Sequence, residues 1–185
     1  LDPAESQLVN FLPGHNSSYK RSHLLAYGEQ LDDMMESETL LHWDLRSQGH
    51  ELYLEASAKA AHTNFARLIP WLPIQFRAGR LFAAGRAQVE SWRWPKRLAY
   101  ILASPLIPLV RFVRIIQQLR QGDRRHLRLP IGTFPVALLG LIADGLGQMV
   151  GYGWGYGTTL QEYADAEFHR ELHLAESDKA EMGLS

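Results

Sequence analysis

The stretch LPGHNSSYKRSHLLAYGEQLDDMMESETLLHWDLRSQGHELYLEASAKAAH, residues 12–62, decides the fold of the first third of the chain. Two helix-like segments within it each end at a glycine, Gly28 and Gly49. Glycine commonly follows a helix because it takes a left-handed backbone conformation without steric cost. Short apolar runs at 51–54 and 58–61 then predict strands. The expected order is strand, loop, helix, acidic turn, helix and strand.

This order resembles the C-terminal half of a family 2 glycosyltransferase catalytic domain. The resemblance is carried by GHN at 14–16, YKR at 19–21, an acidic turn at 36–38, LR-x-x-G at 45–49 and a closing His62. It implies that residues 1–62 form an α/β fragment, the C-terminal half of a GT-A-like mixed sheet domain. A mainly α-helical membrane-associated region is expected to follow.

The resemblance also implies a catalytic base. In the family, a carboxylate at the start of a helix takes the proton of the acceptor hydroxyl as that oxygen attacks the anomeric carbon. Glu38 corresponds best to this base, and Glu36 is the second choice. The family has Glu and Asp in direct succession, whereas Ser37 stands between the two glutamates here. The alternative is structural, because acidic side chains in a first helical turn are also stabilised by the helix dipole.

The family pattern further assigns residues to substrate binding. The loop at 14–16 is expected to face the sugar and acceptor, Lys20 and Arg21 to support the diphosphate, and Trp43 to contact substrate. The alternatives are a solvated basic face for the two cations and a core position for the tryptophan. These residues are Gly14, His15, Asn16, Lys20, Arg21 and Trp43.

A divalent metal, Mg or Mn, is implied as cofactor. In some family members a histidine at the place of His62 ligates this metal together with an aspartate motif from the preceding half of the domain. The alternative is a structural histidine. Residues 1–13 are too few for a nucleotide-binding sheet, so we expect the chain to be a fragment that is inactive alone. The absence of cysteine excludes disulfides and thiolate metal sites from this sequence.

Charge is segregated along the chain although the net charge is −1. Residues 1–62 hold ten acidic and four basic side chains, whereas residues 77–128 hold twelve basic and two acidic ones. The basic segment predicts an anionic partner, either nucleic acid or an anionic membrane surface. Its arginines alternate with apolar runs and it carries no nucleic-acid-binding motif, so we expect the membrane and no nucleic acid.

Two apolar runs support membrane association. Residues 98–110 are uncharged but too short to span a bilayer, which indicates a re-entrant or interfacial position. Residues 129–152 are long enough to span, although Asp144 and Gln148 are costly in hydrocarbon. Basic residues before this run and aromatic residues after it place the active site on the cytoplasmic side by the positive-inside rule. A buried hairpin of a soluble protein is the alternative.

Four segments follow from these patterns. Residues 1–62 are the catalytic part, 63–128 are basic amphipathic interfacial helices, 129–158 form an apolar Gly-rich membrane-associated helix, and 159–185 are an acidic C-terminal helix and tail. Within these segments we predict a helix over 65–90 broken near its prolines, Pro70 and Pro73. A second helix is predicted from Pro95 to Gln121, kinked at its own prolines, and a third over 159–176.

The sequence thus predicts an enzyme of polysaccharide or glycan biosynthesis. It would transfer a sugar, with inversion, from a nucleotide-sugar donor to an acceptor hydroxyl. The alternative from another class is a non-enzymatic membrane adaptor that binds anionic lipid and a protein partner.

Overall fold

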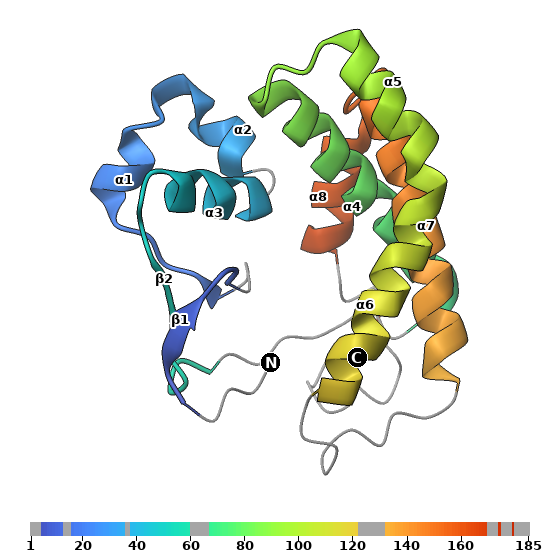
Figure 1. The fold of residues 1–185 in the computed structure, drawn as a ribbon, viewed down its shortest axis with the longest axis horizontal. Helices are drawn as coiled ribbons and strands as arrows, with labels where there is room; N and C mark the ends of the chain where they lie inside the picture. The colour runs from blue at the N-terminus through green and yellow to red at the C-terminus, as the bar shows by residue number, and fades with distance from the viewer. Residues whose placement is uncertain are drawn as a thin grey trace. The chain divides into compact units, whose positions relative to one another are not determined.

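The computed structural model describes residues 5–12, 16–35, 38–59, 67–121, 132–169, 174 and 179. Contacts divide the chain into two compact parts, which we call unit 1 (residues 1–63) and unit 2 (residues 64–185). Figure 1 shows the short helices and strands of unit 1 in blue to cyan and the longer helices of unit 2 in green to red.

The described residues of unit 1 form one antiparallel strand pair and short helices. Strand β1 pairs with strand β2, so that Leu8 lies opposite Tyr53. Both glycines predicted to end a helix have positive φ, 54° at Gly28 and 88° at Gly49. Gly49 follows the helix Glu38–Ser47, but Gly28 begins a 3-10 turn after the first helix has ended at Leu25. The elements are β1 Gln7–Val9, α1 Arg21–Leu25, η2 Gly28–Gln30, α2 Leu31–Met35, α3 Glu38–Ser47 and β2 Leu52–Leu54.

The described residues of unit 1 form no mixed sheet, so the structure supports the helical part of the expected fold class and shows no GT-A-like fragment. The predicted strand at 58–61 is wrong for its described residues. The Ala58 and Lys59 amides bond to the Glu55 and Ser57 carbonyls, which makes a turn. The Glu55 carboxylate accepts further hydrogen bonds around this turn and favours it over a strand. Ala60 and Ala61 lie outside the described residues.

Unit 2 is a helical assembly built on the contact between its two longest helices, α4 and α7. Helices α5 and α6 run beside α7, and α8 packs on α4. The elements are α4 Leu68–Val89, α5 Trp94–Ala103, η3 Ser104–Leu106, α6 Ile107–Gln121, α7 Thr133–Trp154 and α8 Thr159–Phe168.

Helix α4 is continuous, so the predicted break at its prolines is wrong. Pro70 lies in the first turn, where its missing N–H would have no partner in the helix anyway. Pro73 lies inside the helix and has no N–H to donate to the Ile69 carbonyl. Ile69 is on the exposed first turn, where water can supply this hydrogen bond. The kink predicted in the second helix is confirmed: a 3-10 turn at Pro105 joins α5 to α6, and the Ser104 hydroxyl donates to the Tyr100 carbonyl beside it.

Helices α4 and α7 touch through their main chains. A Cβ at Gly147 would collide with the Phe76 carbonyl oxygen, and one at Gly151 with that of Arg80. A Cβ at Gly79 of α4 would collide with the carbonyl of Asp144 in the same way. Residue numbers rise together on the two helices, so α4 and α7 run parallel. Gly147 and Gly151, which are four residues apart, thus form a small-xxx-small pair that packs two helices of the same chain.

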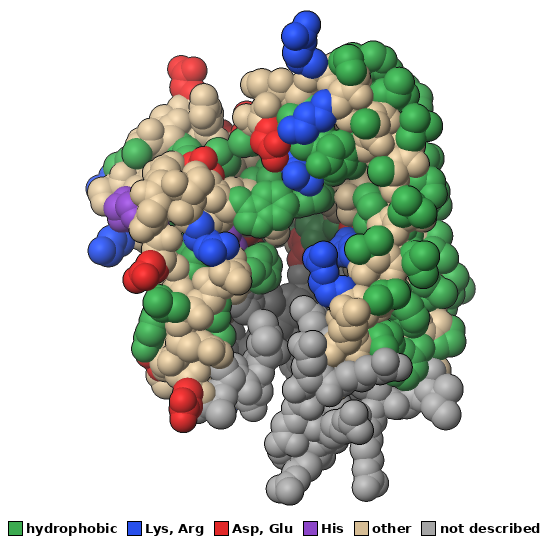
Figure 2. Space-filling view, in the orientation of Figure 1, with side chains coloured by type: hydrophobic (Ala, Val, Ile, Leu, Met, Phe, Trp, Pro, Cys, Tyr) green, Lys and Arg blue, Asp and Glu red, His purple; other side chains and the backbone are tan. Residues whose placement is uncertain are grey.

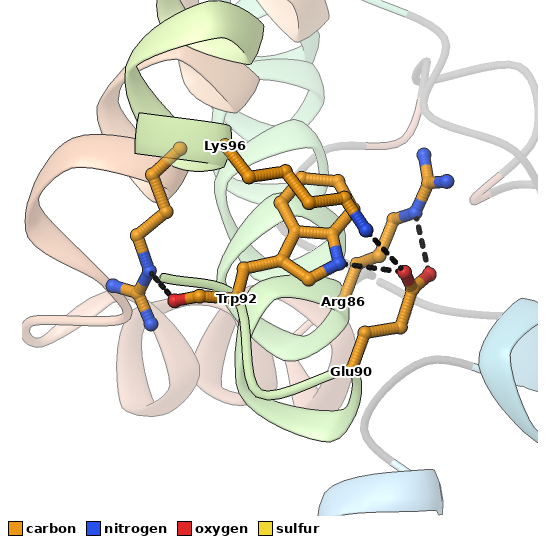
Figure 3. Close-up of polar contacts among 5 residues, drawn as sticks. Arg86, Glu90, Trp92 and Lys96 are labelled. Atoms are coloured by element: carbon orange, nitrogen blue, oxygen red, sulfur yellow. Dashed lines mark hydrogen bonds and ion pairs between the residues drawn. The ribbon is translucent and has the colours of Figure 1, made fainter. Parts of the chain in front are cut away.

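An aromatic cluster closes the corner between α4 and α5. The Trp92 ring stacks on Tyr152 of α7 at a centroid distance of 5.5 Å and lies 4.3 Å from the Tyr100 ring. Figure 3 shows the polar side of this corner: Glu90 accepts hydrogen bonds from Trp92 Nε1 at 2.6 Å, Arg86 Nε at 3.0 Å and Lys96 Nζ at 3.1 Å. This corner joins three helices.

Helix α8 is shorter than predicted, because it ends at Phe168 and His169 leaves the helical conformation. It packs on α4 through an ion pair between Arg77 and Glu162, whose Nε and Oε2 atoms are 2.8 Å apart. Arg80 donates to the Gly155 carbonyl in the turn before α8. Residues 170–173 lie outside the described part of the chain.

Two helical segments, Trp94–Gln117 and Thr133–Trp154, are long and apolar enough to cross a membrane. Only 11% and 28% of their most apolar windows are buried, whereas the core helix of a soluble protein would be mostly buried. Figure 2 shows hydrophobic side chains gathered along the edge of unit 2 formed by α5, α6 and α7. The exposed apolar residues of these helices include Leu98, Leu102, Leu106, Leu109, Leu138, Ile142 and Leu146.

Candidate functional site

The candidate site of unit 1 lies at the N-terminal end of α3. Glu38 is the first residue of this helix and is half-buried. Burial raises the pKa of its carboxyl above the ordinary value. A carboxylate whose pKa is raised binds a proton more readily at neutral pH, which suits a general base. Glu36 lies outside the described residues.

His42 lies one helical turn after Glu38 and is fully buried. Residues four apart in a helix lie on the same side, so both side chains leave α3 in related directions. The His42 Nε2 atom shares a 2.8 Å hydrogen bond with the Tyr19 hydroxyl, and Phe11 packs edge-on against the imidazole. The Nδ1 atom has no hydrogen-bond partner among the described residues. Burial lowers the pKa of His42, so the imidazole is neutral at pH 7.

Tyr19 connects the loop before α1 to α3. Burial raises the pKa of its hydroxyl, a hydrogen bond with the Ser17 side chain lowers it, and the charge of Glu38 raises it further. The loop thus brings a phenol within electrostatic reach of the carboxylate. We call Tyr19, Glu38 and His42 the α3 cluster.

A second set of contacts holds the C-terminal half of α3 in place. The Tyr27 hydroxyl donates to Asp44 Oδ2 at 2.6 Å, and the Gln48 amide donates to the same oxygen at 2.6 Å. Burial and this bond to Asp44 raise the pKa of Tyr27 far above its usual value, so the phenol remains a donor. These bonds fasten the segment after α1 to the C-terminal half of α3.

The other predicted binding residues are placed as follows. Asn16 donates its side-chain amide to the Ala58 carbonyl at 2.8 Å, which ties the loop to the segment after β2. Lys20 and Arg21 are exposed at the start of α1. Trp43 is 42% exposed on α3, so it is not a core residue. Gly14, His15 and His62 lie outside the described residues.

Within the described ranges, no three acidic or histidine side chains group together in a way that could hold a metal ion. A hollow of about 370 Å³ lies at the other end of α3, lined by residues that include Arg46, His50 and Glu51. Since α3 has ten residues, its two ends are about 15 Å apart. This hollow is therefore separate from the α3 cluster.

The sequence did not reveal the hydrogen bond between Tyr19 and His42 near Glu38. The spacing from Glu38 to His42 was a signal, because it matches one helical turn. His42 also lies between Leu41 and Leu45, which are buried. A histidine on an apolar helix face needs a hydrogen-bond partner, and Tyr19 was available in the preceding loop.

No known protein family, curated protein or solved structure matches this chain.

Proposed function

We propose that this chain is the acceptor-side, C-terminal part of an inverting nucleotide-sugar glycosyltransferase, with Glu38 as general base. The observation that carries the proposal is the half-buried Glu38 at the start of α3, whose pKa burial raises. It stands at the position where the residue order resembling family 2 requires a base. The Tyr19–His42 hydrogen bond supports it by ordering the loop beside this carboxylate.

In this mechanism the Glu38 carboxylate accepts the proton of the acceptor hydroxyl as the oxygen attacks the anomeric carbon of the donor. The diphosphate leaves from the opposite side of the sugar, which inverts the configuration. A divalent metal held mainly by the preceding half of the domain would stabilise the leaving diphosphate. Lys20 and Arg21 are exposed and free to face an anionic ligand.

We further propose that unit 2 holds the enzyme at the cytoplasmic face of a membrane. Its support is the exposure of the two apolar segments and the basic residues that flank them. Exposed apolar surface of this extent favours lipid over water. Products of such an enzyme would be glycans or polysaccharides made at the membrane.

The test uses the parent enzyme with nucleotide-sugar donors. Glu38→Gln should lower kcat by about 100-fold or more, because only a positioned base acts in the transition state. Glu36→Gln and the exposed surface variant Glu29→Gln are the matched controls and should leave kcat nearly unchanged. Equal losses in Glu38→Gln and Glu36→Gln would remove the base assignment. The 185 residues alone should turn over no donor. Activity from them would contradict the proposal that the donor site lies in the preceding half of the domain.

The adaptor remains the second candidate, and it is favoured by the same exposed apolar surface of unit 2. An adaptor needs the lipid-binding surface but not the α3 cluster. Glycosyl transfer by the parent protein, lost in Glu38→Gln, excludes the adaptor as the whole function. Lipid binding by a parent protein that transfers no sugar from any donor supports it.

A further inference from the structure

The helices of unit 2 separate apolar and charged residues by side rather than by depth. On α5, η3 and α6 the exposed leucines Leu98, Leu102, Leu106 and Leu109 recur at steps of four, four and three residues. These steps keep them on one side of the helix. Arg111 follows Leu109 by two residues, about 200° around the helix, and so projects from the other side.

Helix α7 has the same division. Leu138, Ile142 and Leu146 are exposed and four residues apart, whereas Gly140 and Gly147 face α4. An apolar groove of about 320 Å³ runs between α6 and α7 and is lined by residues of both stripes, among them Leu109, Leu138, Ile142 and Leu146. The groove therefore joins the α6 end of the first stripe to the stripe on α7 in one apolar face.

Charged side chains occupy the opposite side at the middle of the helices. Arg111 of α6 pairs with Asp144, and the Gln148 amide donates to the same Asp144 oxygen at 2.8 Å. Asp144 is the twelfth residue of the 22 in α7. The Arg111 side chain is 47% exposed and the Asp144 side chain 13%, so the pair reaches the surface of the helices through its arginine.

Helix α4 adds further charge at the same level. Phe76 lies against Gly147 and Arg80 against Gly151, so α4 follows α7 in parallel. Arg77, next to Phe76, is therefore level with the middle of α7, and its ion pair with Glu162 of α8 is also exposed, 29% and 46% for the two side chains. In a membrane-spanning bundle, ionised side chains at this depth almost always face the bundle interior or a water-filled cavity.

We infer that unit 2 lies in the plane of one leaflet rather than crossing the bilayer. The apolar face enters the acyl region, while the Arg111–Asp144 pair, α4 and α8 stay in the headgroup and water layers. Amphipathic helices that separate residues by side take this orientation, with the apolar face buried to about 5–10 Å. The partner is the surface of a lipid leaflet, and the exposed Arg111 and Arg114 favour an anionic one. The inference rests on the proposed membrane association and is independent of the proposed transferase activity.

The chain has no cysteine, so labelling of introduced thiols can test the orientation. The double variant Gly132→Cys/Gln161→Cys places one thiol before α7 and one on α8, both at exposed positions. The full 185-residue chain is reconstituted into sealed phosphatidylcholine–phosphatidylserine vesicles and treated with a membrane-impermeant maleimide. Mass spectrometry then counts labels per molecule, and labelling after detergent lysis checks that both thiols react.

An in-plane unit gives molecules with two labels or none, whatever the orientation of each molecule. A crossing helix gives one label per molecule, and that result would overturn the inference while leaving membrane association intact. A chain that does not bind the vesicles at all would overturn both. Neither outcome bears on Glu38, which is tested by turnover.

A matched pair of single variants checks the depth of each side of α6. Leu109→Cys and Arg114→Cys both replace exposed residues of this helix. On intact vesicles to which the chain is added from outside, Arg114→Cys should react fully and Leu109→Cys only after lysis. Equal protection of both thiols would overturn the in-plane orientation.

Discussion

Gly147 of α7 lies against the main chain of Phe76 in α4, with no room for a side chain between the two helices. The main-chain contact recurs at Gly151, which lies against the Arg80 carbonyl, whereas Gly140 lies against the ring of Trp71. Glycine is required here for close approach rather than for backbone freedom, because its helical φ is ordinary. Helices α4 and α7 thus pack closely through their main chains, and such packing works in water and in lipid.

Gly147→Ala should therefore destabilise unit 2 by about 1–3 kcal/mol, because the added methyl group forces the helices apart. Thermal unfolding in detergent, followed by circular dichroism, measures this loss. Gly153→Ala in the same helix is the control: its Cβ would meet only Ile101 Cδ1 at an ordinary 3.5 Å. That variant should be unchanged or gain up to about 1 kcal/mol from helix propensity. Equal effects at the two positions would contradict the packing.

Trp92→Ala should cost about 3–5 kcal/mol of unfolding free energy, because it removes the ring that packs on Tyr100 and Tyr152. Trp92→Phe keeps an aromatic ring and loses the hydrogen bond to Glu90, so about 1 kcal/mol should be lost. Denaturant unfolding with near-ultraviolet circular dichroism compares the two. If Trp92→Phe is as damaging as Trp92→Ala, the polar contacts of the corner dominate over ring packing.

Glu38→Gln should stabilise unit 1 at pH 7 while abolishing the proposed catalysis. Burial raises the pKa of Glu38, so the folded state holds its proton more tightly than the unfolded state. Stability therefore falls as pH rises from the ordinary glutamate value, about 4.3, through the raised value. The amide carries no charge and should remove this fall. Hydrogen exchange of α3 peptides across pH measures it, with Glu29→Gln as an exposed control.

A Glu38→Gln variant with faster α3 exchange at neutral pH would point to a structural carboxylate instead. Active-site residues commonly lower the stability of the folded protein. The combination of a more stable unit 1 and a less active parent enzyme would therefore separate the two interpretations of Glu38.

His42 should produce a pH dependence of the opposite sign. Burial lowers the pKa of its imidazole, so the unfolded state takes up the proton first as pH falls. Full stability is present above the unfolded value of about 6.5 and is lost as pH falls from there through the lowered value. His42→Leu should remove this dependence. Hydrogen exchange of α3 at two pH values checks it.

Tyr19→Phe is the companion variant. It leaves His42 titratable but takes away the hydroxyl that bonds to Nε2, and a buried polar atom without a partner costs about 1–3 kcal/mol. Its stability should fall at all pH values, and the acid-dependent loss should persist. A pH profile identical to that of His42→Leu would mean that Tyr19, not His42, governs the transition.

Local patterns in the sequence predicted several elements well. Gly49 follows the end of α3 because glycine takes positive φ there at no cost, whereas Gly28, also with positive φ, begins the 3-10 turn η2 instead of ending α1. Pro105 and its neighbours bend the α5–α6 segment because proline removes a helix hydrogen bond. The same rule failed in α4, because Pro70 lies in the first turn of that helix. Whether a proline breaks a helix depends on its position in the helix.

The candidate site was only partly predictable. Glu38 was found because it begins a helix in a recognisable order of features. Its partners were not, because the loop residue Tyr19 and the helix residue His42 are 23 positions apart. No local sequence pattern predicts that two such residues meet. Their contact depends on the path that the chain takes between them.

The sequence by itself determined the apolar and basic segments and the end of α3 before Gly49, since each depends on the chemistry of neighbouring residues. Only the tertiary structure decided that Gly147 meets Phe76, that Arg111 neutralises Asp144, and that the apolar residues of α6 and α7 share one face. The reason is physical: periodicity gives the sides of each helix, but which sides meet depends on packing between residues distant in the chain.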